Sequence, residues 1–256
     1  MTDTTAVLAR PTFLDSGRGV SIAYHSTPGK SPGVMFCGGF MSDMTGSKAL
    51  ALEAFCRERG QGFVRFDYAG HGQSSGRCED GTIGSWTEDA LAVLDRVAQG
   101  PQVIVGSSMG GWIALNLALA RADRVTALVG IAAAPDFTED LIWHDLPTEA
   151  QMMLETDGVI YEPSEYSDKP YPITMTLIHE ARAHLRLRGE IAIDCPVRLL
   201  HGMVDPDVPW KRSLTLAEKL RTQDVRVILV KDGDHRLSRE QDLALLTSTV
   251  GELLTV

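Results

Sequence analysis

The segment "GSSMGG", residues 106–111, combines two potential nucleophiles with three glycines. Within it the pattern G-x-S-x-G fits only Ser108, because Ser107 would need glycines where Val105 and Met109 stand. The apolar run "VIV" precedes the segment and "WIALNLALA" follows it, which predicts a strand before the turn and a helix after it. A serine on such a strained turn projects its hydroxyl clear of the backbone and can act as a nucleophile. The alternative is a glycine-rich turn that only permits close packing.

A serine nucleophile needs a base, and the base needs an orienting group. Of the seven histidines, His235 lies in the turn-rich "VKDGDHRLS", between the last predicted strand and the last predicted helix. Reactive residues of a parallel sheet collect beyond the carboxyl ends of its strands, so this position favours His235 as the base. Asp205 closely follows the strand "RLLHG" and is the preferred acid, while Asp207 and Asp136 remain alternatives. The order Ser108, Asp205, His235 matches the order that one enzyme fold uses.

Acyl transfer through a serine also needs two backbone N–H groups that bind the developing oxyanion. The predicted donors are the amide of Met109, directly after the nucleophile, and that of Phe40, in the segment "CGGF" after a short buried strand. Gly38 and Gly39 would let this backbone approach a substrate closely. The competing interpretation of the two glycines is an ordinary tight turn.

Apolar runs alternate with helical patterns along most of the chain, which is typical of a mostly parallel sheet with helices on both faces. The alternation fails between residues 136 and 190, where the helical pieces "PTEAQMMLETDG" and "ITMTLIHEARAHLRLRG" flank the turn-rich "YEPSEYSDKPYP". We therefore predict one α/β core formed by residues 1–135 and 191–256, interrupted by a helical cap over residues 136–190.

Composition and charge exclude several classes of protein. Of 256 residues, 44% are hydrophobic and 23% are charged, a balance that is ordinary for a globular protein. No run approaches the roughly 18 apolar residues of a membrane span, so stable membrane insertion is not predicted. A net charge of −10 argues against nucleic acid as a partner. The four cysteines lack metal-ligand spacing and the amino-terminal residues show no secretion signal, so we predict reduced thiols and a cytoplasmic location.

Together these motifs resemble those of the α/β-hydrolase superfamily over nearly the whole chain. The matching segments are "CGGF", "FDYAGHGQSSG", "GSSMGG", "HGMVDPDVP" and "GDHRLS". Longer segments, such as "FCGGFMSDMTGSKALALEAFC" and "RLLHGMVDPDVPW", are similar to a group of hydrolases that act on S-palmitoyl protein thioesters and acyl-glucuronides. The resemblance implies an α/β-hydrolase fold, a doubly wound sheet of about eight strands with a small cap inserted after the sixth. It also implies a catalytic triad of Ser108, Asp205 and His235, with no metal or organic cofactor.

The predicted cap offers candidates for substrate binding. It contains 12 Asp or Glu residues against four Lys or Arg residues, so most of the chain's net negative charge lies there. Arg182 and Arg186 are candidates for binding a carboxylate or phosphate, and Trp143 is a candidate for lining an acyl pocket. The competing interpretations are ion pairs with acidic neighbours for the arginines and the cap's own core for the tryptophan.

We therefore predict a serine hydrolase that cleaves carboxylic esters or thioesters of small-molecule or acylated substrates through an acyl-enzyme. One alternative keeps the fold and cleaves an amide or carbon–carbon bond instead. The other is a ligand-binding protein on a hydrolase scaffold, in which turnover is vestigial. Product analysis with matched ester, amide and diketone substrates separates the two enzymes, and a burst without steady turnover indicates the binding protein.

Overall fold

The computed structural model describes residues 10–163 and 170–254, and within them the main sheet has eight strands. Their spatial order is β1 (Thr12–Asp15), β2 (Ser21–Thr27), β4 (Gln61–Phe66), β3 (Lys30–Cys37), β5 (Gln102–Ser107), β6 (Val125–Ile131), β9 (Val197–Gly202) and β10 (Val225–Val230). The pairs β1–β2 and β2–β4 are antiparallel, and the other neighbouring pairs are parallel. The predicted fold, a mostly parallel sheet of about eight strands, is confirmed.

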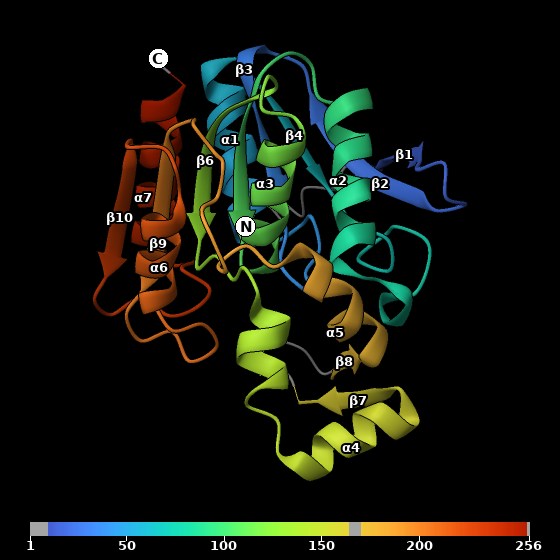
Figure 1. Ribbon diagram of the computed structural model, residues 1–256. Helices are drawn as coiled ribbons and strands as arrows, with labels where there is room; N and C mark the ends of the chain where they lie inside the picture. Colours follow the sequence, from blue (N-terminus) through green and yellow to red (C-terminus); the bar gives the residue numbers. More distant parts are fainter. Residues whose placement is uncertain (1–9, 164–169, 255–256) are drawn as a thin grey trace, which may run out of the picture.

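Helices cover both faces of the sheet (Figure 1). One face carries α2 (Ile83–Arg96), α3 (Met109–Ala120) and α6 (Lys211–Lys219), and the other carries α1 (Ser47–Arg59) and α7 (Glu240–Leu253). A short 3₁₀ helix, Cys78–Asp80, precedes α2. The sequence of α3, "MGGWIALNLALA", is apolar all round, and the helix is accordingly buried along most of its length. The first turn of α3 is therefore held inside the core.

The carboxyl ends of the parallel strands lie at the lower edge of the sheet in Figure 1, on the side where the cap projects. Parallel strands bring the loops that follow them to one edge, however far apart those loops are in sequence. The loops after β3, β4, β5, β9 and β10 consequently meet there, and they carry the candidate site.

The chain between β6 and β9 forms the cap. The prediction was a helical cap, but the segment also contains two strands. It contains a π-helical segment (Thr138–Trp143), α4 (Thr148–Asp157), β7 (Val159–Glu162), β8 (Tyr171–Thr174), α5 (Met175–Ala181) and a 3₁₀ helix (Arg182–His184). β7 and β8 pair as an antiparallel hairpin, which packs with Leu154 and Ile178 in a small core of the cap's own. Part of the predicted turn-rich linker, residues 164–169, lies outside the described residues.

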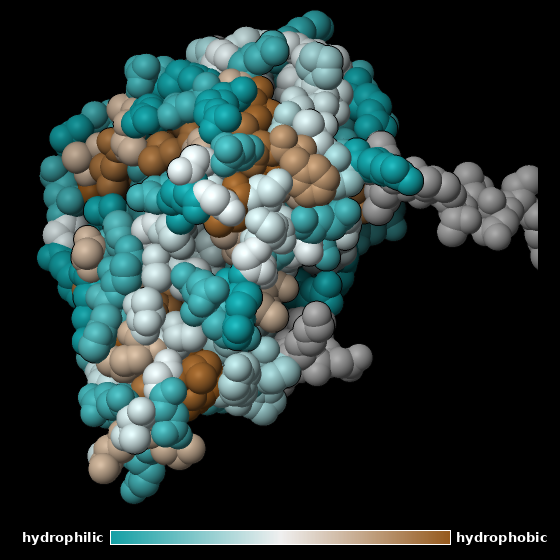
Figure 2. All heavy atoms as spheres, turned by 90° about the vertical axis from the view of Figure 1, so that its right-hand side faces the viewer, coloured by the Kyte–Doolittle hydropathy of each residue, from teal (hydrophilic) through white to brown (hydrophobic). Residues whose placement is uncertain are grey.

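The surface of the cap mixes polar and apolar side chains. Met152 and Met153 on α4 and Tyr161 on β7 are exposed. The lower end of the molecule in Figure 2 shows hydrophilic and hydrophobic residues side by side. In the described part of the chain, no helix combines the length and the apolar character needed to cross a bilayer.

Candidate active site

Ser108 lies on a sharp turn between β5 and α3. Its φ of 54° and ψ of −119° fall where residues other than glycine are uncommon, and such strain costs on the order of 1–3 kcal/mol. The turn is held by its backbone, because the Ser108 amide donates to the Ile131 carbonyl at 2.9 Å. A Cβ on Gly106 would lie 2.6 Å from the carbonyl carbon of Gly110, so the first glycine of the motif is a steric requirement of this turn.

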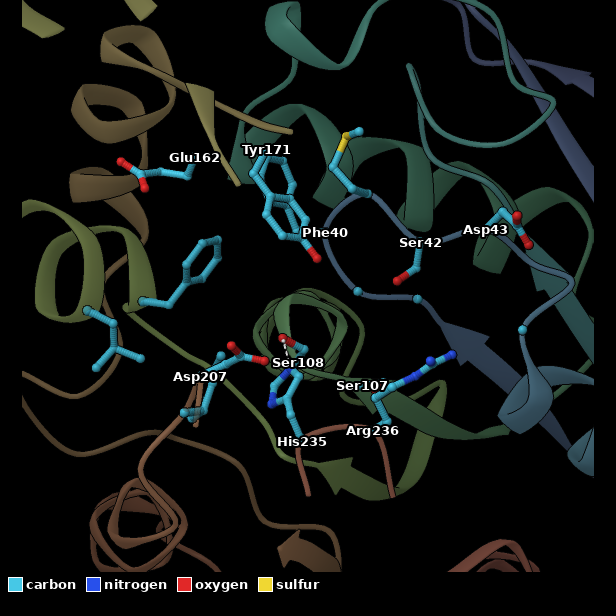
Figure 3. A pocket seen from close by; sticks show the side chains of 18 of the residues that line it. Phe40, Ser42, Asp43, Ser107, Ser108, Glu162, Tyr171, Asp207, His235 and Arg236 are labelled. Atoms are coloured by element: carbon cyan, nitrogen blue, oxygen red, sulfur yellow. Dashed lines mark hydrogen bonds between the residues drawn. The ribbon is translucent and has the colours of Figure 1, made fainter. Parts of the chain in front are cut away.

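The imidazole of His235 contacts the hydroxyl of Ser108, and the dashed line in Figure 3 marks this bond. Its Nε2 lies 3.1 Å from Ser108 Oγ, and its Nδ1 lies 2.8 Å from Oδ2 of Asp205. An ionised carboxylate only accepts, so Nδ1 carries the proton and Nε2 accepts the hydrogen bond from the serine hydroxyl. The structure thus brings together the three predicted residues in the arrangement that a general base and its orienting acid require.

Asp205, rather than Asp207 or Asp136, is the acid that contacts His235. Its side chain is fully buried. Burial alone would raise the pKa of the Asp205 carboxyl, but hydrogen bonds from His201 and His235 outweigh that effect and hold this pKa below its usual range. Asp207 is exposed and lines the cavity above the serine.

Asp136, the third candidate, has a structural position instead. Its buried carboxylate accepts from the backbone amides of Arg186 at 2.7 Å and Leu187 at 2.8 Å. Burial raises the pKa of this carboxyl. Since residue 136 starts the predicted cap and residues 186–187 lie near its end at residue 190, Asp136 joins the two chain segments that connect the cap to the core.

Distances alone would allow a cation beside His235, because ligand atoms of Asp205, Asp207 and His235 all lie within 4.8 Å of one another. However, the Asp205 carboxylate already accepts hydrogen bonds from four donors, which uses the lone pairs that a metal would need. Hydrogen bonding therefore explains this cluster without a metal ion.

The loop after β3 carries the predicted oxyanion amide of Phe40, and two residues after β4 hold this loop in place. His71 Nε2 accepts from the Met41 amide at 3.1 Å, and Asp67 Oδ1 accepts from the Met44 amide at 2.6 Å. A Cβ on Gly39 would lie 3.4 Å from Ser108 Cβ, so the loop backbone runs directly beside the predicted nucleophile.

Neither His71 nor Asp67 is predicted as a site residue from the sequence. The available signal is their presence in "FDYAGHG", directly after the strand β4. Nδ1 of His71 lies 3.1 Å from the Ala69 carbonyl, so that nitrogen carries the proton and Nε2 is free to accept. Burial lowers the pKa of His71 to about 4, which keeps the ring neutral at physiological pH.

A cavity of about 840 Å³ opens above Ser108 and His235, between the core and the cap (Figure 3). The cap contributes mostly apolar side chains to its wall, among them Ile142, Leu146 and Ile173. Tyr171 also lines the cavity, and its ring stacks on that of Phe40 at 5.6 Å between centroids. The core side is more polar, with residues such as Ser42, Asp43, Lys48 and Arg236. An apolar wall opposite polar groups is typical of a site for an amphiphilic ligand.

The predicted substrate-binding residues are engaged elsewhere. Among the described residues, the lining of this cavity includes none of Trp143, Arg182 and Arg186. Arg182 donates to Glu139 Oε2 at 2.8 Å and lies over the Trp143 ring, 5.3 Å from its centroid. Arg186 donates to Oδ1 of the buried Asn116 at 2.7 Å. The competing interpretation fits Arg182, which pairs with an acidic residue of the cap, and Trp143, which packs against the cap's own core. It does not fit Arg186, whose partner is a neutral amide of the core and not an acidic neighbour.

This fold, with a serine at the turn after its central strand, defines the class of the protein. A family model described as the alpha/beta hydrolase fold matches residues 34–177. The mouse protein named "Palmitoyl-protein thioesterase ABHD10, mitochondrial" is 45% identical over 243 residues, which cover 94% of this chain and 82% of that protein. The human protein of the same name is 44% identical over 235 residues, covering 91% and 76%. The chain therefore belongs to the α/β-hydrolase family.

Solved structures agree with this assignment. The alpha/beta hydrolase domain-containing protein 10 from mouse superposes with a TM-score of 0.89 at 44% identity, covering 96% of this chain and 99% of that one. A putative hydrolase from Agrobacterium vitis S4 superposes with a TM-score of 0.90 at 43% identity, covering 95% and 97%. The resemblance inferred from the motifs is thus confirmed.

The prediction of a cytoplasmic location is wrong, because the mouse, rat and human relatives are named as mitochondrial proteins. The prediction depended on the cysteines and on the absence of a secretion signal. The four cysteines are free thiols in the structure. Free thiols argue against an oxidising compartment, but they do not distinguish one reducing compartment from another.

Proposed function

We propose that this protein is a serine hydrolase that cleaves acyl thioesters and carboxylic esters through an acyl-enzyme. Ser108 is the nucleophile, His235 the general acid and base, and Asp205 the group that orients His235. The observation that carries the proposal is the unbroken chain of hydrogen bonds from Asp205 through His235 to Ser108, at the floor of the cavity. The names of the 44–45% identical relatives, palmitoyl-protein thioesterases, support thioesters as a substrate class.

The reaction follows from this geometry. His235 Nε2 takes the proton of Ser108 Oγ as the oxygen attacks the acyl carbonyl, and the Asp205 carboxylate stabilises the imidazolium that forms. The backbone amides of Met109 and Phe40 bind the oxyanion, assisted by the amino-terminal end of α3, whose partial positive charge points toward it. His235 then protonates the departing thiol or alcohol. Water, activated by the same imidazole, attacks the ester on Ser108 and releases the carboxylic acid.

The walls of the cavity support a division of the substrate between its two sides. The apolar side chains of the cap, such as Ile142 and Leu146, would cover the acyl group. The thiol or alcohol portion, including the sugar of an acyl-glucuronide, would lie toward the polar wall of the core. A volume of about 840 Å³ is in the upper part of the range that small-molecule sites occupy.

The test is covalent labelling combined with turnover. A fluorophosphonate probe should label the native protein once, and mass spectrometry of the labelled peptide should place the adduct on Ser108 and not on its neighbour Ser107. Ser108→Ala should abolish labelling and reduce hydrolysis of p-nitrophenyl acetate and of an S-acyl thioester by at least about 10⁴-fold, with thermal unfolding retained. A label on Ser107, or thioester hydrolysis that persists in the alanine variant, would refute the assignment.

A matched series identifies the bond that is cleaved. The same acyl group should be presented as an oxygen ester, a thioester, an acyl-glucuronide and an amide, together with a diketone. We expect turnover of the first three. Faster turnover of the amide or the diketone would instead support the alternative in which this fold cleaves an amide or carbon–carbon bond.

A further inference from the structure

His201, at the carboxyl end of β9, is fully buried and belongs to neither the nucleophile turn nor the cavity wall. Its ring nitrogens nevertheless have three close polar neighbours. Nδ1 lies 2.7 Å from Oγ of Ser213, on α6. Nε2 lies 3.1 Å from Asp205 Oδ2 and 3.0 Å from the carbonyl oxygen of Val208. His201 therefore contacts the same carboxylate oxygen of Asp205 as His235 does.

The neighbours determine which nitrogen of His201 carries the proton. The Val208 carbonyl can only accept, so Nε2 must be the protonated nitrogen, and its N–H also points at Asp205. In the neutral tautomer Nδ1 has a free lone pair, which accepts the hydrogen bond from the Ser213 hydroxyl. Ser213 is itself buried, which keeps water from competing for that lone pair. The ring is thus a donor toward Asp205, with its orientation set from both ends.

The surroundings of Asp205 show what this donor contributes. Oδ1 accepts from the backbone amides of Asp207 at 2.9 Å and Val208 at 2.8 Å. Oδ2 accepts from His201 and His235. A carboxylate offers about four lone-pair sites, so all of them are used and the plane of the group is fixed. Without His201, one site of a buried carboxylate would lack a donor and Oδ2 would be held by His235 alone.

We propose that His201 is a positioning residue of the active site: it donates a hydrogen bond to Asp205 that holds the carboxylate in the orientation that His235 needs. A continuous chain then runs from Ser213 on α6 through His201 and Asp205 to His235. The catalytic consequence rests on the proposed function, because it assumes that His235 activates Ser108. The hydrogen-bonded arrangement itself does not depend on that assumption.

A purely space-filling role for His201 makes a different prediction, and two substitutions separate the roles. His201→Gln keeps an N–H donor at nearly the reach of Nε2, whereas His201→Leu keeps apolar bulk and removes the donor. If the donor matters, kcat for an ester substrate should fall by about 10- to 100-fold in the leucine variant, the range expected for one hydrogen bond to a charged group. KM should change little, since His201 lies outside the cavity wall. The glutamine variant should recover most of kcat.

Nuclear magnetic resonance of the native protein tests the geometry without relying on activity. In ¹⁵N-histidine-labelled protein, His201 should show a protonated Nε2 and an unprotonated Nδ1. The low-field proton of the His235–Asp205 hydrogen bond should be present in the native protein and the glutamine variant, and broadened or shifted in the leucine variant. This measurement remains decisive if the leucine variant does not fold.

The outcomes are distinct. Equal loss of kcat in the leucine and glutamine variants, or an unprotonated Nε2 on His201 in the native protein, would overturn the proposal. If the native protein shows no Ser108-dependent hydrolysis, the proposed function fails. The tautomer and the low-field resonance then still decide whether His201 holds Asp205.

Discussion

Replacing Gly110 with alanine should separate the packing of the nucleophile turn from its chemistry. Gly110 is the second residue of α3 and is buried under the strand-to-loop junction after β3. A Cβ there would lie 2.7 Å from the carbonyl carbon of Cys37, and closer still to the carbonyl oxygens of Cys37 and Gly38. These atoms belong to backbone that leads directly into the loop of Phe40, so no side-chain rotation can relieve the overlap.

Two effects oppose each other in this variant. Alanine is favoured over glycine within a helix by about 1 kcal/mol. Ordinary carbon–carbon contacts are about 3.5 Å, so the junction after β3 must move by roughly 1 Å, and overpacking of this kind typically costs about 1–3 kcal/mol. We expect the steric cost to win, with a net loss of up to about 2 kcal/mol in the free energy of unfolding. A shift of about 1 Å in the Phe40 amide should lower kcat by about 100-fold.

The assay is urea unfolding combined with kcat and KM for p-nitrophenyl acetate. Gly189→Ala is the matched control, because a Cβ at this exposed glycine would meet nothing within 4 Å. It should leave stability and kcat unchanged. If Gly110→Ala behaved like this control, close packing of α3 against the loop after β3 would not be what positions the oxyanion amides.

Two further variants test the supports around the site. His71→Asn removes a ring whose pKa burial lowers from 6.5 to about 4, so native stability that is complete above pH 6.5 is lost as the pH falls toward 4. Urea unfolding between pH 7 and 4.5 should show up to about 3 kcal/mol less pH dependence in the variant than in the native protein. Asp136→Asn tolerates the φ of 61° but replaces one acceptor oxygen by a donor, and should cost about 2 kcal/mol. Limited proteolysis should then cut faster near residues 182–190, whereas the exposed control Asp157→Asn should match the native protein in both assays.

The core of the fold could be predicted because its signals are local. The strand before Ser108 and the helix after it are consecutive apolar segments, and their periods differ enough to distinguish β5 from α3. The parallel sheet then follows from repeating this alternation along the chain. The same alternation places Asp205 and His235 after strands, which is why a sequence argument could select them without any contact information.

The cap could not be predicted in the same way. β7 and β8 have four residues each, too few to establish a period of two, and each follows or precedes a helical pattern that masks it. Their pairing joins Val159 to Thr174 and Glu162 to Tyr171, across residues that no local rule connects. The hairpin is therefore a product of tertiary packing, which overrides weak local preference.

Residue type led to wrong expectations for the cap arginines and gave no indication of the contact made by His201, for one physical reason. An arginine in an acidic segment suggests an anionic ligand, yet Arg182 already has a carboxylate partner in Glu139, and a substrate would have to displace it. A histidine inside an apolar strand suggests a core residue, yet a buried imidazole must satisfy two nitrogens, and His201 does so by donating to Asp205. In both cases the partner determines the role. Burial makes such partners obligatory, so the contacts of a buried polar group carry more functional information than its type.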